Sequence, residues 1–207
     1  MELVDISPLI SPRSAVFPGD VAFRREVSAD IDEGDHLTLS SIHGTCHVGA
    51  HADAPSHYVR GGEDIASRPL DLYVGECEVV AVELTPPRPA IVSDLPSRTA
   101  PWPERVLFRT GSFPDPEDWT DDFTSLSPEL IAYLGSRGVR LVGIDTPSID
   151  PASSKTLAAH AMVARYDMAI LENLVLGHVD PGAWELIAFP LKIEGADAGP
   201  VRAVLRR

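Results

Sequence analysis

The sequence contains few cysteines, few basic residues and no long apolar run. Cys46 and Cys77 are its two cysteines among 207 residues, too few for a disulfide framework, so we expect two reduced thiols. The 17 basic residues are outnumbered by 31 acidic ones. The resulting net charge of −14 argues against a nucleic-acid partner, because binding a phosphate backbone requires a basic patch. No apolar run approaches the roughly 20 residues that cross a bilayer, so we expect no membrane partner.

Two sequence signals are also missing. The first ten residues, MELVDISPLI, contain no basic region ahead of an apolar stretch, so we expect no signal peptide and a cytoplasmic protein. The motif Gly-x-Ser-x-Gly does not occur, which argues against a serine hydrolase of the α/β-hydrolase type. The length and the hydrophobic content of 44% predict one globular domain that spans residues 1–207.

The most informative stretch is residues 47–57, which read HVGAHADAPSH. Imidazole nitrogens and carboxylate oxygens are ligands that zinc prefers and that manganese and iron also accept. If the segment is extended, alternate side chains share a face, so His47, His51 and Asp53 would converge on one side. The small residues between them leave room for a metal ion. His57 follows the cluster and could be a further ligand or a proton carrier.

Alternative interpretations of this stretch are weaker. Surface histidines would explain it, but four of the seven histidines fall within residues 43–57, a spacing that chance rarely produces. Cys46 would point away from the ligand face of a strand, so we interpret it as a small packed side chain. His43 shares the parity of the ligands and could support them or replace one, but a structural role is favoured. Pro55 is expected to end the strand.

Short apolar runs and turn signals predict an α/β domain with a mixed sheet. Strands are expected at residues 2–6, 78–84, 105–110, 139–145, 168–172, 185–191 and 201–205, and residues 21–42 are expected to be extended around a turn at 32–35. A helix should begin after Ser127, an N-cap followed by Pro128, and end near Gly138; a second should span residues 155–165. The six prolines of residues 85–103 indicate a surface loop, with a short helix near Val92–Leu95.

Longer strings resemble a known family. The pattern of residues 47–57 is similar to the signature His-x-Gly-Thr/Ala-His-x-Asp-x-Pro-x-His of the cyclase family of metal-dependent hydrolases. The strings GIDTPSIDPASSKTLAAH at residues 143–160 and AILE at 169–172 resemble the bacterial kynurenine formamidase (arylformamidase) branch of that family. Similar matches run close to the full length of the chain, at residues 5–8, 18–20, 71–77, 107–110 and 200–206.

The resemblance implies a swivelling β/β/α architecture and a binuclear metal site, with zinc as the expected metal and manganese as the alternative. It places the first ion on His47, His51 and Asp53, whose two oxygens can bridge the ions, and completes the second with His160 and Glu172. On their own, an isolated histidine and an isolated glutamate would be weak evidence. Glu172, however, ends an apolar strand, and a cation would offset the cost of burying its carboxylate.

The resemblance also implies a reaction, the hydrolysis of N-formyl-L-kynurenine to L-kynurenine and formate in tryptophan degradation. A metal-activated hydroxide would attack the formyl carbon, and His57 would act as general acid/base. Phe17 stands where this branch typically has a tryptophan that contacts the substrate; it keeps an aromatic face but lacks the indole donor. A homodimer with substrate pockets near the subunit interface is expected as well.

Two rival functions remain open on the sequence alone. Another hydrolase of the cyclase superfamily, acting on a different amide or cyclic substrate, would share the metal ligands but not necessarily the string at residues 143–160. A non-catalytic zinc-binding module would need a closed site, and such sites are commonly rich in cysteine. The ligand set here contains carboxylates and lies beside His57, so an open catalytic site is the better interpretation.

Overall fold

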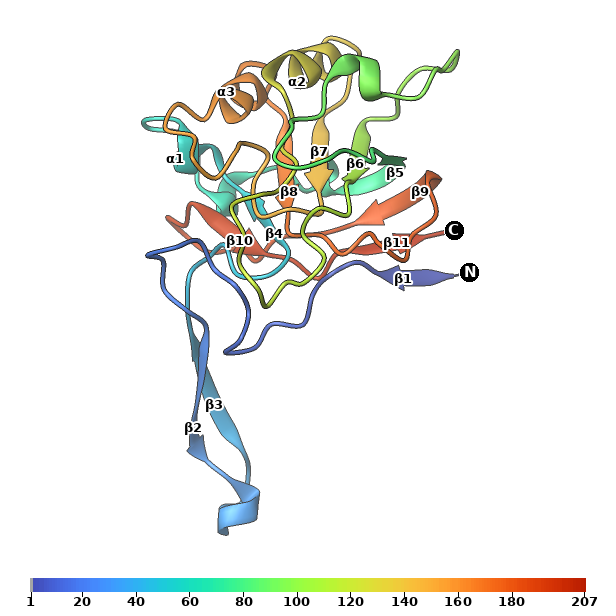
Figure 1. The fold of residues 1–207 in the computed structure, drawn as a ribbon. Coiled ribbons are helices and arrows are strands. Elements are labelled where there is room, and N and C mark those ends of the chain that lie inside the picture. The colour runs from blue at the N-terminus through green and yellow to red at the C-terminus, as the bar shows by residue number, and fades with distance from the viewer. Residues whose placement is uncertain (1) are drawn as a thin grey trace.

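A nine-stranded mixed sheet organises the computed structural model, which describes residues 2–207 (Figure 1). In spatial order its strands are β1 (Leu3–Asp5), β11 (Val204–Arg206), β9 (Gly182–Ile187), β5 (Val74–Ala81), β6 (Arg105–Arg109), β7 (Leu141–Ile144), β8 (Ala169–Glu172), β4 (His51–Asp53) and β10 (Ala198–Pro200). Strands β5 to β8 run parallel and the other neighbours pair antiparallel. The predicted α/β class with a mixed sheet is confirmed.

The sheet curls so far that its two ends approach each other. β10 is an edge strand, whereas β11 lies next to the opposite edge. Yet Pro200 ends β10 and Val204 begins β11, and four residues of chain span at most about 14 Å. The predicted strand at residues 201–205 is therefore wrong in its bounds, because residues 201–203 form the link between two strands that pair with different partners.

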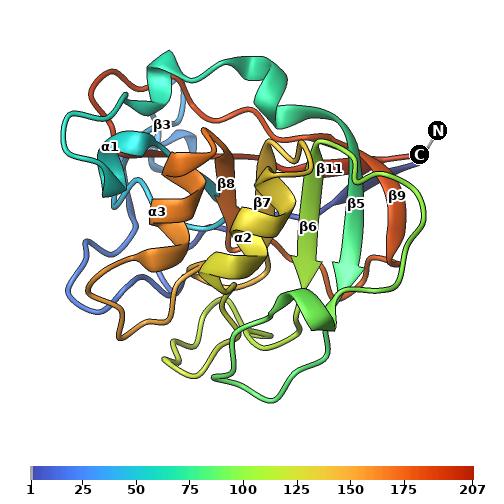
Figure 2. The same cartoon turned by 90° about the horizontal axis from the view of Figure 1, so that it is seen from above.

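Two helices cover one face of the parallel strands (Figure 2). They are α2 (Pro128–Gly135) and α3 (Ala158–Arg165). The predicted start of the first is confirmed, because the Ser127 side chain accepts a hydrogen bond from the Leu130 N–H at 3.1 Å. This helix ends at Gly135, and Gly138, with φ of +86°, lies in the turn beyond it. The second helix begins three residues later than predicted.

Each face of the sheet has its own hydrophobic core, so the parallel strands are buried on both sides. Leu107 packs into the core on the face away from the helices, with residues such as Tyr73 and Trp184. The next residue, Phe108, packs into the core beneath the helices, with Leu130. This alternation explains why the strand sequences read as continuous apolar runs rather than as alternating patterns.

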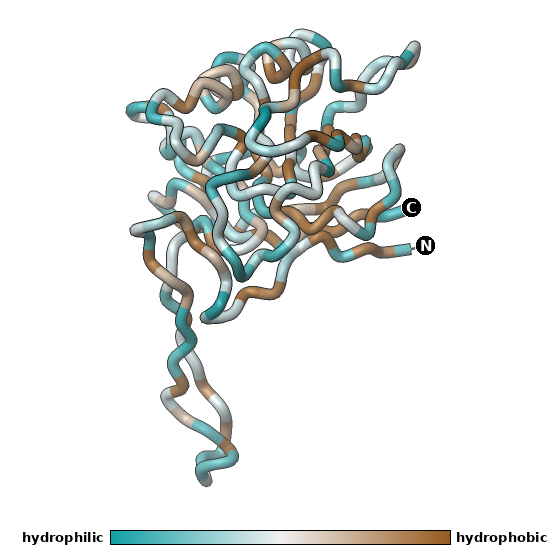
Figure 3. The backbone as a smooth tube through the Cα atoms, viewed as in Figure 1, coloured by the Kyte–Doolittle hydropathy of each residue, from teal (hydrophilic) through white to brown (hydrophobic). Residues whose placement is uncertain are grey.

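A long hairpin projects away from this body (Figure 1). It consists of β2 (Arg24–Ala29) and β3 (Leu39–His43), with the 3-10 helix η1 (Ile31–Glu33) at its tip. The predicted extended segment with a turn at residues 32–35 is thus confirmed. Apolar residues lie along the hairpin (Figure 3), and Val27, Leu39 and Ile42 are exposed.

The remaining elements are short. The helix α1 (Pro55–Tyr58) follows β4 directly, so Pro55 does end the strand. The 3-10 helices are η2 (Ile65–Ser67), η3 (Leu70–Tyr73) and η4 (Val92–Asp94), the last of which is the short helix predicted in the proline-rich loop. β5 and β9 begin four and three residues before their predicted starts. Among residues 2–207, no helix has the length and apolar character needed to cross a membrane.

Candidate metal centre

The histidine-rich segment forms a turn followed by a short strand. Only His51–Asp53 is extended, as β4, whereas residues 46–50 form turns and bends. Gly49 has a φ of +62°, and a Cβ there would lie 2.8 Å from Cγ1 of Ile10, so this position favours glycine. The prediction that His47 shares a strand face with the other ligands is wrong, because the chain turns back at Gly49. The turn nevertheless brings Nδ1 of His47 to 3.1 Å from Oδ1 of Asp53.

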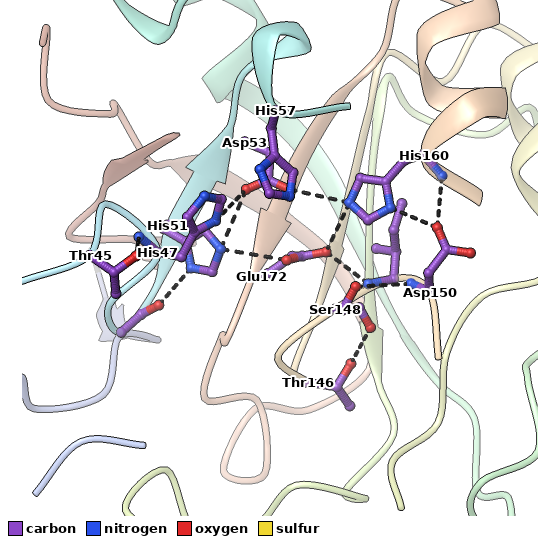
Figure 4. Close-up of polar contacts among 12 residues, drawn as sticks. Thr45, His47, His51, Asp53, His57, Thr146, Ser148, Asp150, His160 and Glu172 are labelled. Atoms are coloured by element: carbon purple, nitrogen blue, oxygen red, sulfur yellow. Dashed lines mark hydrogen bonds and ion pairs between the residues drawn. The ribbon is translucent and has the colours of Figure 1, made fainter. Parts of the chain in front are cut away.

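Pairing between β4 and β8 aligns the next two donors. His51 is directly opposite Glu172 in the antiparallel register, and directly opposite residues project from the same face. Nε2 of His51 lies 3.5 Å from a carboxylate oxygen of Glu172. His160, from the first turn of α3, reaches the same point from above the sheet, with Nε2 3.7 Å from Glu172. The structure therefore brings together all five residues predicted as ligands (Figure 4).

The Asp53 carboxylate lies at the centre of this group. Its Oδ1 faces His47 and also Nε2 of His51, at 3.5 Å, while its Oδ2 faces Nε2 of His160 at 3.3 Å. Asp53 is 1% exposed. Burial alone would raise the pKa of its carboxyl group, but the hydrogen bond with His160 and the charges of the His47 and His51 imidazoles together outweigh burial and hold the pKa well below its usual value. The carboxylate is thus ionised, and its two oxygens face different imidazoles.

Two buried atoms in this centre have no hydrogen-bond partner. They are Nε2 of His51 and Oδ1 of Asp53, and leaving such groups unpaired costs on the order of 1–3 kcal/mol each. One ligand atom from each of His51, Asp53 and Glu172 lies within 4.8 Å of the others, and the same holds for His47, Asp53 and His57. The two groups share Asp53. The donors therefore fit divalent cations, which would satisfy both unpaired atoms.

Contacts behind the donors orient the imidazoles. Nδ1 of His51 pairs with the Gly49 carbonyl at 2.9 Å, and Nδ1 of His160 pairs with Asp150 at 2.7 Å. Both contacts turn Nε2 of the ring toward the centre, as is usual for metal-binding histidines. Asp150 also accepts the backbone N–H groups of Ala159 and His160. The sequence analysis missed Asp150, although an acidic residue ahead of a helix N-terminus was a usable signal.

Asp197 is a second residue that the sequence analysis missed. It precedes β10, and its Oδ2 lies 3.1 Å from Nε2 of His47 and 3.5 Å from Nδ1 of His57. One carboxylate oxygen thus contacts the imidazoles of both α1 and the preceding turn. No motif surrounds Asp197 in the sequence, and the contact arises because β10 pairs with β4 across the curled sheet.

The other histidines and cysteines have different surroundings. The ring of His57 faces the centre, with its centroid 4.4 Å from that of His47. His43 lies exposed on β3 of the hairpin and, within the described chain, outside both groups of donor atoms. Cys77 is buried in the core and Cys46 is half-buried. Burial is the main reason that the pKa of each thiol is raised, so neither is an activated thiolate.

A cavity of about 440 Å³ opens onto the donors, a size that suits a small organic ligand. His47, His51, His57, His160 and Glu172 line it on one side. On another side Phe17 packs edge-on against Trp119, with ring centroids 5.2 Å apart. Phe17 therefore lies in the cavity wall, while its contact with a substrate stays a prediction, and Trp119 is an additional aromatic residue that the sequence analysis missed.

The raised pKa of His160 predicts that the free energy of unfolding of the metal-free protein depends on pH. Burial would lower the pKa of His160, but hydrogen bonds to Asp150 and Asp53 outweigh it and raise the pKa to about 10. The protonated His160 therefore stabilises the folded state. This stabilisation is complete below the pKa of the histidine in the unfolded chain, about 6.5, and is lost as the pH rises through about 10. After chelation, the free energy of unfolding in urea should fall by at least about 1 kcal/mol between pH 6.5 and 9.5.

The control for this measurement is the variant His160→Gln, which lacks one titrating imidazole and should show a smaller pH dependence, because His47, with its pKa raised to about 9, still titrates. The metal-loaded protein should also lose the trend, because metal-binding histidines are neutral. An equal slope in the chelated protein and in the His160→Gln variant would contradict the assignment.

Comparisons with known proteins agree with a metal-dependent hydrolase of the cyclase family. Residues 4–151 match the family model named Cyclase. A kynurenine formamidase from Bordetella avium (strain 197N) is 47% identical over 205 residues, covering 99% of this chain and 97% of that protein. Among solved structures, a protein from Bacillus stearothermophilus described as a predicted metal-dependent hydrolase is 26% identical with a TM-score of 0.81, covering 99% of this chain and 97% of that one.

A further solved structure shares the fold at lower sequence identity. Isatin hydrolase A from Ralstonia solanacearum is 21% identical, with a TM-score of 0.80 over 99% of this chain and 91% of that one; at this identity the likeness concerns the fold alone. The family model covers most of the chain, and the formamidase relative covers nearly all of it. The chain is therefore a hydrolytic enzyme of the cyclase family.

Proposed function

We propose that the protein is a kynurenine formamidase that hydrolyses N-formyl-L-kynurenine to L-kynurenine and formate. The observation that carries this proposal is a set of five donor residues, four of them buried, that opens onto a cavity with an aromatic wall. The Bordetella avium relative, 47% identical over nearly the whole chain, bears the name of this activity. The substrate combines an aromatic ring with a scissile formamide, and the cavity offers a surface for each.

The proposed metal complement is two zinc ions per subunit. His47, His51 and Asp53 would hold the first ion, and His160 and Glu172 would complete the second, with Asp53 between them. The mixture of imidazoles and carboxylates suits zinc, with manganese as the alternative. When bound, two such cations lower the pKa of a water molecule and polarise a carbonyl group.

His57 is proposed as the group that moves the proton. Its imidazole lies at the edge of the cavity, about a third exposed, near Asp197 and the donor cluster. His57 would accept a proton from the water that adds to the formyl carbon. It would return that proton to the aryl nitrogen as the C–N bond breaks, so that the amine leaves in neutral form. The contact with Asp197 holds the ring in place for both transfers.

The aromatic wall is proposed to receive the aryl ring of the substrate. Phe17 and Trp119 meet edge to face, an arrangement that aromatic groups favour and a third ring could join. The indole N–H of Trp119 donates to Asp121 at 2.8 Å, so the surface that faces the cavity is apolar. Trp119 thereby supplies indole area that Phe17 lacks compared with the tryptophan typical of this branch.

The function is tested by kynurenine release from N-formyl-L-kynurenine. Purified protein loaded with zinc should turn over this substrate, chelation should abolish turnover, and added zinc or manganese should restore it. Isatin and simple aliphatic formamides, tested in parallel, should react at least about 100-fold more slowly. A metal-loaded, folded sample that hydrolyses isatin but not the formamide would replace the proposal with the broader cyclase-family alternative.

A histidine variant separates proton transfer from metal binding. His57→Ala should lower kcat by about 100-fold or more, the usual contribution of a general acid/base, while the zinc content stays unchanged. The matched control is His178→Ala, since His178 is exposed and contacts the Asp5 carbonyl, away from the cavity. Loss of zinc together with activity would show that His57 is a ligand, as its proximity to His47 and Asp53 permits. Unchanged turnover would eliminate both roles.

A homodimer is proposed from the exposed hairpin. An isolated two-stranded hairpin is at best marginally stable in water, and β2–β3 presents exposed apolar side chains over much of its length. A second copy that covers these residues would stabilise the hairpin and remove the apolar surface from water. This interpretation agrees with the position of the hairpin outside the main sheet (Figure 1).

Light scattering after size-exclusion chromatography tests this proposal. The particle mass should be about twice the chain mass of 22.3 kDa. Ile42→Lys should shift the protein toward the monomer. Ile42 is 72% exposed in the single chain, and a lysine at this position would have to bury its charge in the dimer interface. Ser41→Lys, which places the same charge on the neighbouring residue of β3, is the matched control. A monomeric wild-type protein at micromolar concentration would contradict the proposal.

A further inference from the structure

Asn173 occupies a distinctive position immediately after Glu172. It has a φ of +55°, in the left-handed region that asparagine tolerates better than most residues. Its backbone N–H donates to the Thr146 carbonyl at 2.9 Å, and the next N–H, from Leu174, donates to Ile144 at 3.1 Å. The backbone at the end of β8 is therefore held by β7 and the residues that follow it, which fixes the position of the Asn173 side chain.

The carboxamide of Asn173 is free to bind a ligand. The residue lines the same cavity as His57, His160 and Phe17. Neighbouring polar groups are already engaged; Glu172, for example, accepts the Ile149 N–H at 2.7 Å. Within residues 2–207, the Asn173 carboxamide takes part in no such hydrogen bond. It offers two N–H donors and one carbonyl acceptor toward the cavity.

Asn173 also lines space outside the donor cluster. It lines two smaller hollows that adjoin the cavity, one beside Phe113 and Pro116 and the other beside Pro8 and Ala15. None of the five donors lines either hollow. A substrate whose formamide lies at the donors would thus place its scissile bond there. Its remaining polar groups would extend toward Asn173.

The charged residues that line the cavity indicate how a substrate carboxylate would be bound. Among the described residues that line the cavity there is no lysine and no arginine, whereas Asp20 and Glu172 are acidic. In the metal-loaded protein, whose metal-binding histidines are neutral, a substrate carboxylate therefore meets no lysine, arginine or charged histidine in this lining, and neutral donors can bind it. The amide N–H groups of an asparagine are suited to this task, because they bind a carboxylate without a charge of their own.

We propose that Asn173 is a specificity-determining residue whose carboxamide donates a hydrogen bond to the carboxylate of the amino-acid side chain carried by the aryl ring. This inference rests on the proposed function, since it names the part of N-formyl-L-kynurenine that the enzyme recognises apart from the formamide. A site built to hydrogen-bond a substrate group discriminates against analogues that lack the group. Asn173 thus distinguishes the amino-acid substrate from simpler aryl formamides.

Kinetics with two substrates test the proposal. Asn173→Gly removes the carboxamide but keeps a residue that readily adopts a positive φ. It should lower kcat/KM for N-formyl-L-kynurenine about 10-fold or more, mainly through KM. The change for 2′-formamidoacetophenone, which keeps the ring, ketone and formamide but lacks the amino-acid end, should be less than about 2-fold. Asn173→Asp keeps the shape but adds a negative charge, so it should lose more activity on the first substrate than the glycine variant.

Binding of L-kynurenine gives an independent readout. Calorimetric titration of the zinc-loaded protein should show an affinity about 10-fold weaker for Asn173→Gly than for the wild type, with equal zinc content and equal Tm. Equal kinetic losses on both substrates, or no loss on either, would overturn the proposal. If the wild type hydrolyses neither substrate, the proposed function fails; equal affinities of wild type and variant for L-kynurenine, or no binding by either, would then overturn the role of Asn173 separately.

Discussion

The structure depends on one buried carboxylate that several parts of the chain must reach at once. Asp53 lies in β4, between β8 and β10, and contacts imidazoles from the preceding turn, from its own strand and from α3. Because an unpaired charge in this position would be strongly destabilising, each contacting segment is constrained in register. The same constraint gives the site its chemical character, since acidic oxygens and imidazole nitrogens gathered out of water have a strong affinity for cations.

Curling of the sheet is the second condition for this arrangement. The short link between β10 and β11 joins strands from opposite regions of the sheet, so the sheet must bend back on itself. Direct pairing of β10 with β4 carries Asp197 to His47 and His57, and the bend lets the same chain continue into β11. The orientation of the rings is thus a product of the global topology as much as of local sequence.

The sequence predicted the fold class, the start of α2 and the five residues that the structure brings together around Asp53, because each depends on local patterns or on long family strings. It failed where tertiary contacts decide. The strand assumed for residues 47–53 is largely a turn, since Gly49 adopts a positive φ against Ile10. Asp197 and Trp119 act through partners distant in sequence, and no local pattern marks either residue. Val201–Ala203 has strand-like composition, yet pairing on either side converts it into a link.

The pairing of the first strand with the last has a consequence for biosynthesis. β1 takes β11 as its sheet neighbour, and Asp197 lies only ten residues before the end of the printed sequence. A ribosome makes β1 and the turn around His47 well before their partners, β11 and Asp197. The nascent chain therefore carries its histidine cluster in an incomplete setting through most of translation. Final assembly of the site, and tight capture of metal with it, must await the synthesis of Asp197 and β11.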